Sequence, residues 1–195
     1  MTITTIRHGE TDWNLQRRPQ GSMDIPLNQT GLDQAQALST KLANTPCDVI
    51  YTSSLQRAKT TAEIINTQHK VPLIATDSLR EQSFGPFEGQ VLETEDDAYD
   101  FTMYMDKHID AHFAKISAFM HELTQASHED IFVVAHFGTI RCIICHLLGL
   151  PIRQRKRYPI GNTAVHRFES QAQGGFAMVL ENDTGHLHDP KAPSF

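Results

Sequence analysis

A group of reactive side chains follows the first apolar segment of the chain. Met1–Ile6 alternates apolar and polar residues, and Arg7-His8-Gly9-Glu10-Thr11 comes directly after it, with Trp13 and Asn14 close behind. A cationic side chain, an imidazole and a glycine at the end of a strand are typical of a site that binds an anion and holds a nucleophile. The sequence therefore predicts chemistry on an anionic substrate at this point of the fold.

A phosphate monoester is one anion on which these residue types could act. Arg7 and Arg57 can offer paired N–H donors to phosphoryl oxygens, and a neutral His8 imidazole can attack phosphorus. Glu81 can protonate the departing oxygen and then activate water, while His136, if protonated, would stabilise the equatorial charge. The scheme requires no metal, because two arginines and a histidine would supply the positive charge.

The elements that must position these residues form an alternating pattern. Short apolar runs alternate with helical patterns, which predicts an α/β fold: a three-layer α/β/α sandwich with a mostly parallel central sheet and an antiparallel edge strand. The predicted strands are Thr2–Arg7, Asp48–Thr52, Leu73–Ala75, Ile131–His136, Ala164–Glu169 and Phe176–Glu181. The predicted helices are Thr30–Ala43 with Thr30 as its cap, Ser54–Asn66 with Ser54 as its cap, Tyr99–Gln125 and the apolar run Ile140–Leu150.

Four of the predicted strands end next to a candidate residue. His8 follows the first strand, Arg57 comes soon after the second, Glu81 after the third, and His136 ends the fourth. Because the carboxyl ends of parallel strands share one edge of the sheet, we expect the four side chains to meet in one crevice. The backbone N–H groups at 137 and 138 open the next helix, which is a natural place for an anion.

The same residues resemble those of the histidine phosphatase superfamily, which contains cofactor-dependent phosphoglycerate mutases and many small phosphatases. The resemblance covers nearly the whole chain. Its motifs are Arg7-His8-Gly9-Glu10-Thr11 with Trp13-Asn14, Gln20–Asn28 with Gly31, Ser53–Ala58 with Thr61-Ala62, Leu79-Arg80-Glu81 with Phe84-Gly85, Val134–Gly138, and Asn162-Thr163. The resemblance implies that His8 is phosphorylated, that Arg7, Arg57 and His136 form the phosphate pocket, and that Glu81 is the acid and base.

Asn14, Gln20, Gly21 and Phe137 are further candidates for substrate binding, although Asn14 and Gln20 can equally serve as turn residues. Phe137 departs from the family, whose members commonly have glycine there. We expect its ring to narrow the pocket or to shift the local backbone.

The region between Glu81 and Thr139 also departs from the mutases, in which it is longer and supplies basic residues for a highly anionic substrate. Here it contains no arginine, and its only lysines are Lys107 and Lys115. The acidic run Glu93–Asp100 would repel such a substrate if it faces the pocket. The short insertion also offers little material for a cap that excludes water. The sequence therefore favours a phosphatase over a mutase.

The predicted function is a metal-independent phosphomonoesterase that acts on a small molecule through a phosphohistidine, with no cofactor. Two alternatives stay open. One is a cofactor-dependent phosphoglycerate mutase. The other is a non-catalytic, phospholigand-binding regulatory module, whose turnover Phe137 would have abolished.

Composition limits the setting in which this chemistry occurs. The 195 residues fit one domain, 1–195, with a short cap insertion around 84–100. A net charge of −6 opposes sequence-independent binding to nucleic acid, and the apolar runs are too short to cross a membrane. Three cysteines without framework spacing, and a His8 too near Met1 for a cleavable signal, favour the cytoplasm. The oligomeric state is not evident from the sequence.

Several other residues invite a functional interpretation but have a simpler one. Cys142 and Cys145 lie in an apolar helical run and are expected in the core. The histidines at 108 and 112, and those at 186 and 188, have no third ligand at suitable spacing, so we expect exposed side chains rather than a metal site. The basic run 153–157 is expected to be a solvated turn, with a role in substrate binding only if it borders the crevice.

Overall fold

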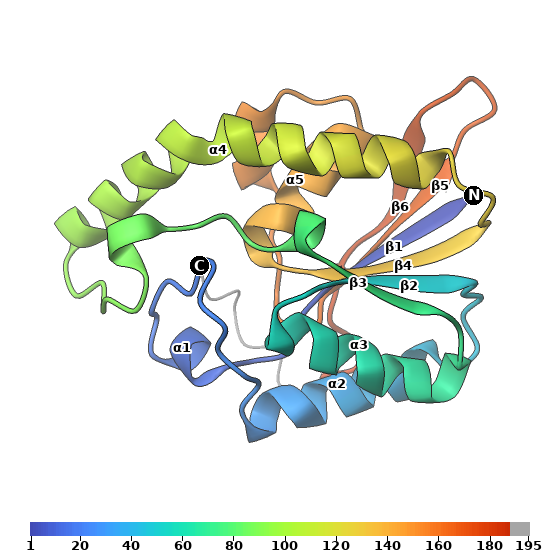
Figure 1. Cartoon of the computed structure of the whole chain (residues 1–195), viewed down its shortest axis with the longest axis horizontal. Coiled ribbons are helices and arrows are strands. Elements are labelled where there is room, and N and C mark those ends of the chain that lie inside the picture. Colours follow the sequence, from blue (N-terminus) through green and yellow to red (C-terminus); the bar gives the residue numbers. More distant parts are fainter. Residues whose placement is uncertain (188–195) are drawn as a thin grey trace.

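A computed structural model describes residues 1–187 of the chain, in which a six-stranded sheet lies between two layers of helices (Figure 1). The strands are β1 (Thr2–Arg7), β2 (Val49–Ser53), β3 (Leu73–Thr76), β4 (Asp130–Ala135), β5 (Val165–Ser170) and β6 (Phe176–Asp183). Their order is β3-β2-β4-β1-β5-β6. The first four strands in this order are parallel, and β5 runs antiparallel to both β1 and β6. The predicted fold class is therefore confirmed, and the antiparallel part holds two strands.

Two helices cover each face of the sheet. In Figure 1, α4 and α5 lie above the strands and α2 and α3 lie below them. The α-helices are α1 (Asp12–Leu15), α2 (Gln29–Leu42), α3 (Gln56–His69), α4 (Glu95–Thr124) and α5 (Phe137–Leu147). Three short 3₁₀ helices complete the description: η1 (Asp77–Leu79), η2 (Gly85–Phe87) and η3 (Ile152–Arg157).

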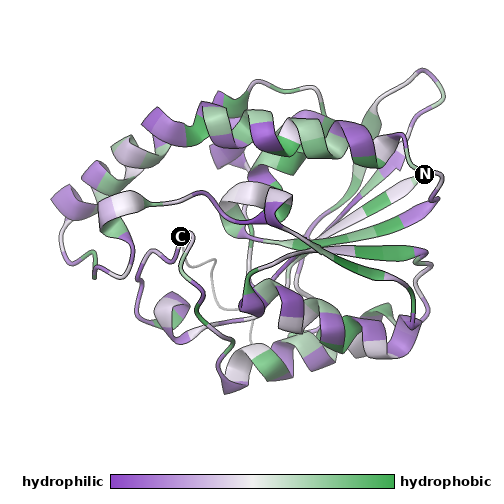
Figure 2. Cartoon of the chain, viewed as in Figure 1, coloured by the Kyte–Doolittle hydropathy of each residue, from purple (hydrophilic) through white to green (hydrophobic). Residues whose placement is uncertain are grey.

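Strand alternation divides the core between the two faces. In β4, Ile131 and Val133 belong to the apolar cluster under α4 and α5, while Phe132 and Val134 belong to the cluster under α2 and α3. Apolar residues accordingly colour the central strands in Figure 2, and polar residues colour the outer helix faces. Both cysteines of α5 are buried as free thiols, which confirms their expected place in the core.

The helices begin at residues other than those predicted. Asn28, not Thr30, caps α2, because its side chain accepts a hydrogen bond from the Gly31 N–H (2.8 Å). Helix α3 begins at Gln56 without a side-chain cap, since the Ser54 hydroxyl binds Asp77 instead. Helix α4 begins four residues before the predicted Tyr99, where Thr94 and Asp97 form a capping box. Within residues 1–187, no helix combines the length and the apolar composition needed to cross a bilayer.

Candidate active site

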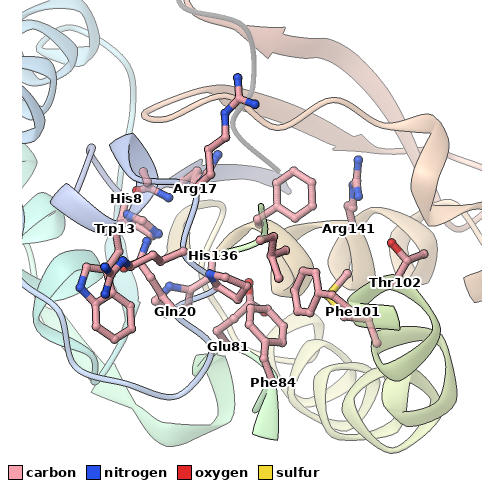
Figure 3. Close-up of a pocket in the computed structure, with 18 of the residues that line it drawn as sticks. His8, Trp13, Arg17, Gln20, Glu81, Phe84, Phe101, Thr102, His136 and Arg141 are labelled. Carbon is pink, nitrogen blue, oxygen red and sulfur yellow. The ribbon is translucent and has the colours of Figure 1, made fainter. Parts of the chain in front are cut away.

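The carboxyl ends of the parallel strands open into a pocket of about 340 Å³ (Figure 3). Every residue that the sequence put forward for the site lines this pocket: Arg7, His8, Asn14, Gln20, Gly21, Arg57, Glu81, His136 and Phe137. The sheet brings them together as expected, because β1 and β4 are paired along their whole length and end side by side. Their individual contacts indicate what each can do.

His8 is held as a neutral ring with one nitrogen available. It is buried, and its Nδ1 lies 2.6 Å from the Gly9 carbonyl oxygen. A carbonyl oxygen only accepts, so Nδ1 carries the proton and Nε2 keeps its lone pair. Burial lowers the pKa of His8 well below its usual value, and the charges of Arg57 and Arg7 lower it further. The arrangement keeps a nucleophile ready at neutral pH.

His136 has the opposite tautomer to His8. Arg57 donates from Nε to His136 Nδ1 (3.2 Å), so the proton of the neutral ring lies on Nε2. Burial lowers the pKa of His136 well below its usual value, with Arg57 and His8 adding to the effect. Its Nε2 is buried and has no hydrogen-bond partner among the described residues. A buried donor of this kind fits a phosphoryl oxygen, but as a neutral N–H rather than the imidazolium expected from the sequence.

Two buried arginines supply positive charge beside the histidines. Burial lowers the pKa of both Arg7 and Arg57 to about 10, while the charge of Glu81 raises it, so both remain cations at neutral pH. Arg57 also donates to the carbonyl oxygens of Met23 (2.6 Å) and Gly21 (2.8 Å). It therefore fixes the 21–23 loop as well as His136, and only part of its donor set remains for a substrate.

Glu81 caps the helix that follows His136. Its Oε2 accepts from the Gly138 N–H (2.8 Å), and its Oε1 accepts from the Thr139 N–H (3.1 Å), the Thr139 hydroxyl (3.2 Å) and the Gln82 N–H (3.0 Å). The anion position expected at the start of α5 is thus occupied at Gly138 by this carboxylate. Since Oε2 accepts only one of these bonds, it is the oxygen with a lone pair for proton transfer.

Gly138 is required for this approach. A Cβ atom at residue 138 would lie 2.8 Å from Glu81 Oε1, closer than atoms of this kind pack. The local sequence Gly138-Thr139 therefore sets the position of the carboxylate.

The turn after β1 and the 20–23 loop are held by side chains of their own. Asn14 Oδ1 accepts from the Thr11 N–H (3.2 Å) as part of the α1 capping box, so its carbonyl group serves the turn. Gly21 has a positive φ of 50°, and a Cβ there would lie 2.3 Å from Glu88 Oε1. Glu88 Oε1 in turn accepts from the Ser22 N–H (2.8 Å). The Gln20 side chain is buried in the pocket wall, with Oε1 unpartnered in the described structure.

Other parts of the pocket were missed by the sequence reasoning. The apolar wall is formed largely by Trp13, Phe84, Leu92, Ala98, Phe101 and Met105, and the cations Arg17, Arg18 and Arg141 also line the pocket. Lys156 lines it too, so the basic run 153–157 does border the crevice, the condition under which a role in substrate binding was expected. The expectation of a site poor in basic residues is therefore wrong, because the cations come from outside the 81–139 region. The first turns of α4 also line the pocket, so the insertion contributes more residues to it than we expected from its short length. The acidic side chains of 93–100, in contrast, do not line the pocket.

The remaining candidates differ in part from their simple interpretation. His112 is buried, not exposed: its Nε2 lies 3.2 Å from Thr139 Oγ1 and 3.8 Å from Glu81 Oε1. Within the basic run 153–157, Arg155 is buried against Asp106 rather than solvated. His186 is half-buried, with Nε2 2.8 Å from Thr163 Oγ1, and His188 lies outside the described residues. Within residues 1–187, no group of three or more His, Cys, Asp or Glu side chains is arranged to hold a metal ion.

Comparison with known proteins identifies the family. The profile of the histidine phosphatase superfamily (branch 1) matches residues 3–184. The chain belongs to this superfamily. It is a phosphatase-type enzyme, in agreement with the names of its relatives.

The relatives of this histidine phosphatase include both classes weighed above. It is 35% identical over 149 residues to the uncharacterized phosphatase PhoE of Bacillus subtilis, covering 75% of this chain and 77% of that protein. It is 28% identical to the probable phosphoglycerate mutase GpmB of Proteus mirabilis, covering 97% and 96% of the two chains. A phosphoserine phosphatase from Entamoeba histolytica, solved with phosphoserine, superposes with a TM-score of 0.82 at 29% identity, covering 95% of this chain and 98% of that one.

Phe137 of this histidine phosphatase contributes a ring to the pocket without disturbing the backbone. Helix α5 begins at Phe137 with His136 as an extended N-cap residue. The guanidinium carbon of Arg141 lies 3.9 Å from the centre of the ring, and that of Arg7 lies 5.4 Å from it. We expected the ring either to narrow the pocket or to shift the local backbone. The ring lies in the pocket wall, and α5 begins regularly.

Proposed function

We propose that the chain hydrolyses small-molecule phosphomonoesters through a phosphohistidine on His8. The observation that carries this proposal is the tautomer of His8, whose Nδ1–H is bound to the Gly9 carbonyl while Nε2 is left as a buried nucleophile. Arg7, Arg57 and the Nε2–H of His136 surround the place where phosphoryl oxygens would lie. This arrangement supports phosphate binding and attack in one pocket.

The proposed first step transfers the phosphoryl group to the enzyme. The Nε2 lone pair of His8 forms the P–N bond as the P–O bond to the leaving group breaks, and the Glu81 carboxyl donates its proton to the departing oxygen. In the second step the Glu81 carboxylate takes a proton from water, whose oxygen attacks phosphorus. The P–N bond breaks, inorganic phosphate leaves, and His8 and Glu81 return to their starting states.

In this proposal the arginines provide the charge that a metal often supplies. Arg7 and Arg57 are both buried and cationic at neutral pH, so they can match the negative charge of the transition state without a bound ion. We therefore propose that turnover persists in the presence of a chelator. We also propose a cytoplasmic location, which the three free thiols support.

The test compares His8→Ala with the wild type on a broad panel of phosphomonoesters, with a chelator present. We expect the variant to lose activity by about a thousandfold or more, because the nucleophile is gone. His108→Ala is the matched control, since His108 is exposed on α4 and does not line the pocket. The proposal is wrong if His8→Ala keeps full activity, or if the wild type releases phosphate from no ester.

Trapping provides a direct measurement of the intermediate. Rapid quenching with a labelled substrate should give an acid-labile, alkali-stable label on the wild type and none on His8→Ala. Tight phosphate binding with neither label nor turnover would instead support the non-catalytic regulatory module.

The mutase alternative is tested by its own reaction. Arg17, Arg18 and Arg141 line the pocket, so the charge argument against a highly anionic substrate is weaker than the sequence alone indicated. We nevertheless propose a phosphatase, because α4 contributes no basic residue to the pocket and three of its four lining residues, Ala98, Phe101 and Met105, are apolar. Rapid formation of 2-phosphoglycerate from 3-phosphoglycerate and catalytic 2,3-bisphosphoglycerate would overturn this preference.

A further inference from the structure

One cation in the pocket is not neutralised by an acidic side chain. Arg141, on α5, donates from Nε to the Tyr158 carbonyl oxygen (2.9 Å). Among residues 1–187 it forms no ion pair and its two terminal nitrogens have no hydrogen-bond partner, although the charge of Glu81 acts on it at longer range. Burial lowers the pKa of Arg141 to about 10, so the guanidinium is still charged at neutral pH. A half-buried charge of this kind is costly unless a ligand pairs with it.

The neighbouring cations differ from Arg141 in this respect. Asp106 of α4 contacts Arg155, and it lies 2.7 Å from Lys156 Nζ. Of the four basic residues of η3, Arg155 and Lys156 therefore share one carboxylate. Arg141 shares the pocket wall with Lys156 but not its acidic partner.

The guanidinium of Arg141 lies over the ring of Phe137. The ring centre lies 3.9 Å from the guanidinium carbon, and the Tyr158 bond holds Nε. The ring contact and the hydrogen bond at Nε restrain the guanidinium and leave the terminal nitrogens as a fork of donors. Such a fork matches the two oxygens of a planar carboxylate.

The pocket wall around this fork is largely apolar, with Thr102 and Lys156 as polar members. Phe101 and Met105 of α4 line it, and Trp13 and Phe84 add aromatic surface elsewhere in the pocket. Figure 3 shows Phe101 and Arg141 on one side of the pocket and His8 on the other. A ligand that reaches both sides must pass along apolar side chains, which favours a planar apolar body over a short polar one.

We propose that Arg141 and Phe137 form a carboxylate subsite, and that the substrate is a phosphomonoester with an aromatic body ending in a carboxylate. This inference rests on the proposed function, because the phosphate end must be held at His8. A carboxylate is the group that the subsite fits best, since the fork of one guanidinium matches two coplanar oxygens and balances one negative charge.

The test uses four phosphate esters of primary alcohols, so that the leaving groups are chemically similar. They are 4-(phosphooxymethyl)benzoate, benzyl phosphate, phosphoserine and phosphoethanolamine. In the wild type we expect kcat/KM to be on the order of tenfold or more higher for the benzoate than for benzyl phosphate, which is the range for a charged hydrogen-bonded contact. We expect the two benzyl esters to exceed the two short esters.

Variants assign the preference to Arg141. Arg141→Met should bring the ratio of kcat/KM for the benzoate over benzyl phosphate close to one. Arg153→Met, which removes an exposed charge of η3 that does not line the pocket, should keep the wild-type ratio. Thermal unfolding shows whether each variant folds. If Arg141→Met does not fold, Arg141→Lys replaces it, and we expect a severalfold lower ratio because lysine keeps the charge but not the fork.

The possible failures are separable. Equal turnover of the two benzyl esters by the wild type, or an unchanged ratio in the Arg141 variant, would overturn the subsite and leave the proposed phosphatase intact. Preference for phosphoserine over the benzoate would overturn the aromatic body. Faster turnover of a benzyl ester bearing a second phosphate in place of the carboxylate would assign the subsite to phosphate. If the wild type hydrolyses other phosphomonoesters of the broad panel but none of these four, the subsite is overturned, and if it hydrolyses no phosphomonoester at all, the proposed function itself fails.

Discussion

The two histidines of the pocket, His8 and His136, are held in opposite tautomers. His8 gives its Nδ1–H to a carbonyl, which leaves a lone pair at Nε2, whereas His136 receives the Arg57 Nε–H at Nδ1, which leaves an N–H at Nε2. The partner of Nδ1 therefore decides whether the far nitrogen can attack or can donate. Residue type alone indicates that histidines are present, whereas these second contacts support the proposed roles of His8 as nucleophile and His136 as donor.

Gly138 offers a test of how far the position of the Glu81 carboxylate depends on the N–H groups at the start of α5. In Gly138→Ala, the new Cβ would meet Glu81 Oε1 at 2.8 Å and push the carboxylate away. We expect kcat to fall by about ten- to a hundredfold, as for a displaced acid–base group. Stability should change by less than about 1 kcal/mol, because the better helix propensity of alanine offsets the weakened cap. Steady-state kinetics and urea unfolding measure the two effects.

Glu81→Gln provides the control for this interpretation. If Gly138 acts through Glu81, adding Gly138→Ala to Glu81→Gln should lower kcat little further, since contacting residues are not additive. Wild-type kcat in the single Gly138 variant would show that the approach of the carboxylate is not needed.

At the scale of the elements, the start of α2 shows which cap matters. Asn28 accepts from the Gly31 N–H (2.8 Å) and donates from Nδ2 to Glu10 Oε1 (3.1 Å), whereas the predicted cap, Thr30, is exposed within the helix. We expect Asn28→Ala to lower the free energy of unfolding by about 1 kcal/mol and Thr30→Ala to leave it nearly unchanged. Urea unfolding of the two variants checks this. Equal losses would contradict the assignment of the cap.

The sequence predicted the existence of these elements better than their ends. Apolar patterns located all six strands within one or two residues. In the central strand β4, burial on both faces leaves a continuous apolar run, whereas β1 alternates apolar and polar residues. Helix caps were less predictable, since several hydroxyl and amide side chains lie near each start and tertiary contacts choose among them. Ser54, for example, is drawn to Asp77, which lies far away in sequence.

At the scale of the molecule, the site residues that follow strands were predictable from the sequence, whereas many residues of the pocket wall were not. Four motifs converge because they follow strands of one sheet, a consequence of topology. The α4 residues around Phe101 reach the pocket only through packing, for which no local pattern exists. Arg141 did have a signal: it lies four residues after Phe137 in α5, so both occupy one helix face. The extent of the single domain, residues 1–195, stays a prediction.

The buried histidines predict how the stability of the whole molecule depends on pH. Burial lowers the pKa of His112 and of His166 to about 4, although Glu81 opposes this at His112 and a hydrogen bond to the Pro159 carbonyl opposes it at His166. Between about pH 6.5 and about pH 4 the unfolded chain therefore binds protons that the folded chain does not. Stability rises with pH across this window and is lost as the pH falls. The shift from 6.5 to about 4 corresponds to up to roughly 3 kcal/mol for each group.

His166 isolates this effect, because it lies in β5, does not line the pocket and has a buried Nδ1 without a partner among the described residues. We expect His166→Phe to reduce the difference in unfolding free energy between about pH 7 and about pH 4.5 by about 2 kcal/mol, since the variant has no imidazole to charge in the unfolded state. His121→Phe is the control: that side chain is exposed on α4, so water surrounds it in both states and the difference should match the wild type. Urea unfolding at the two pH values measures each difference. A His166 variant as pH-sensitive as the wild type would show that the acid loss of stability arises elsewhere.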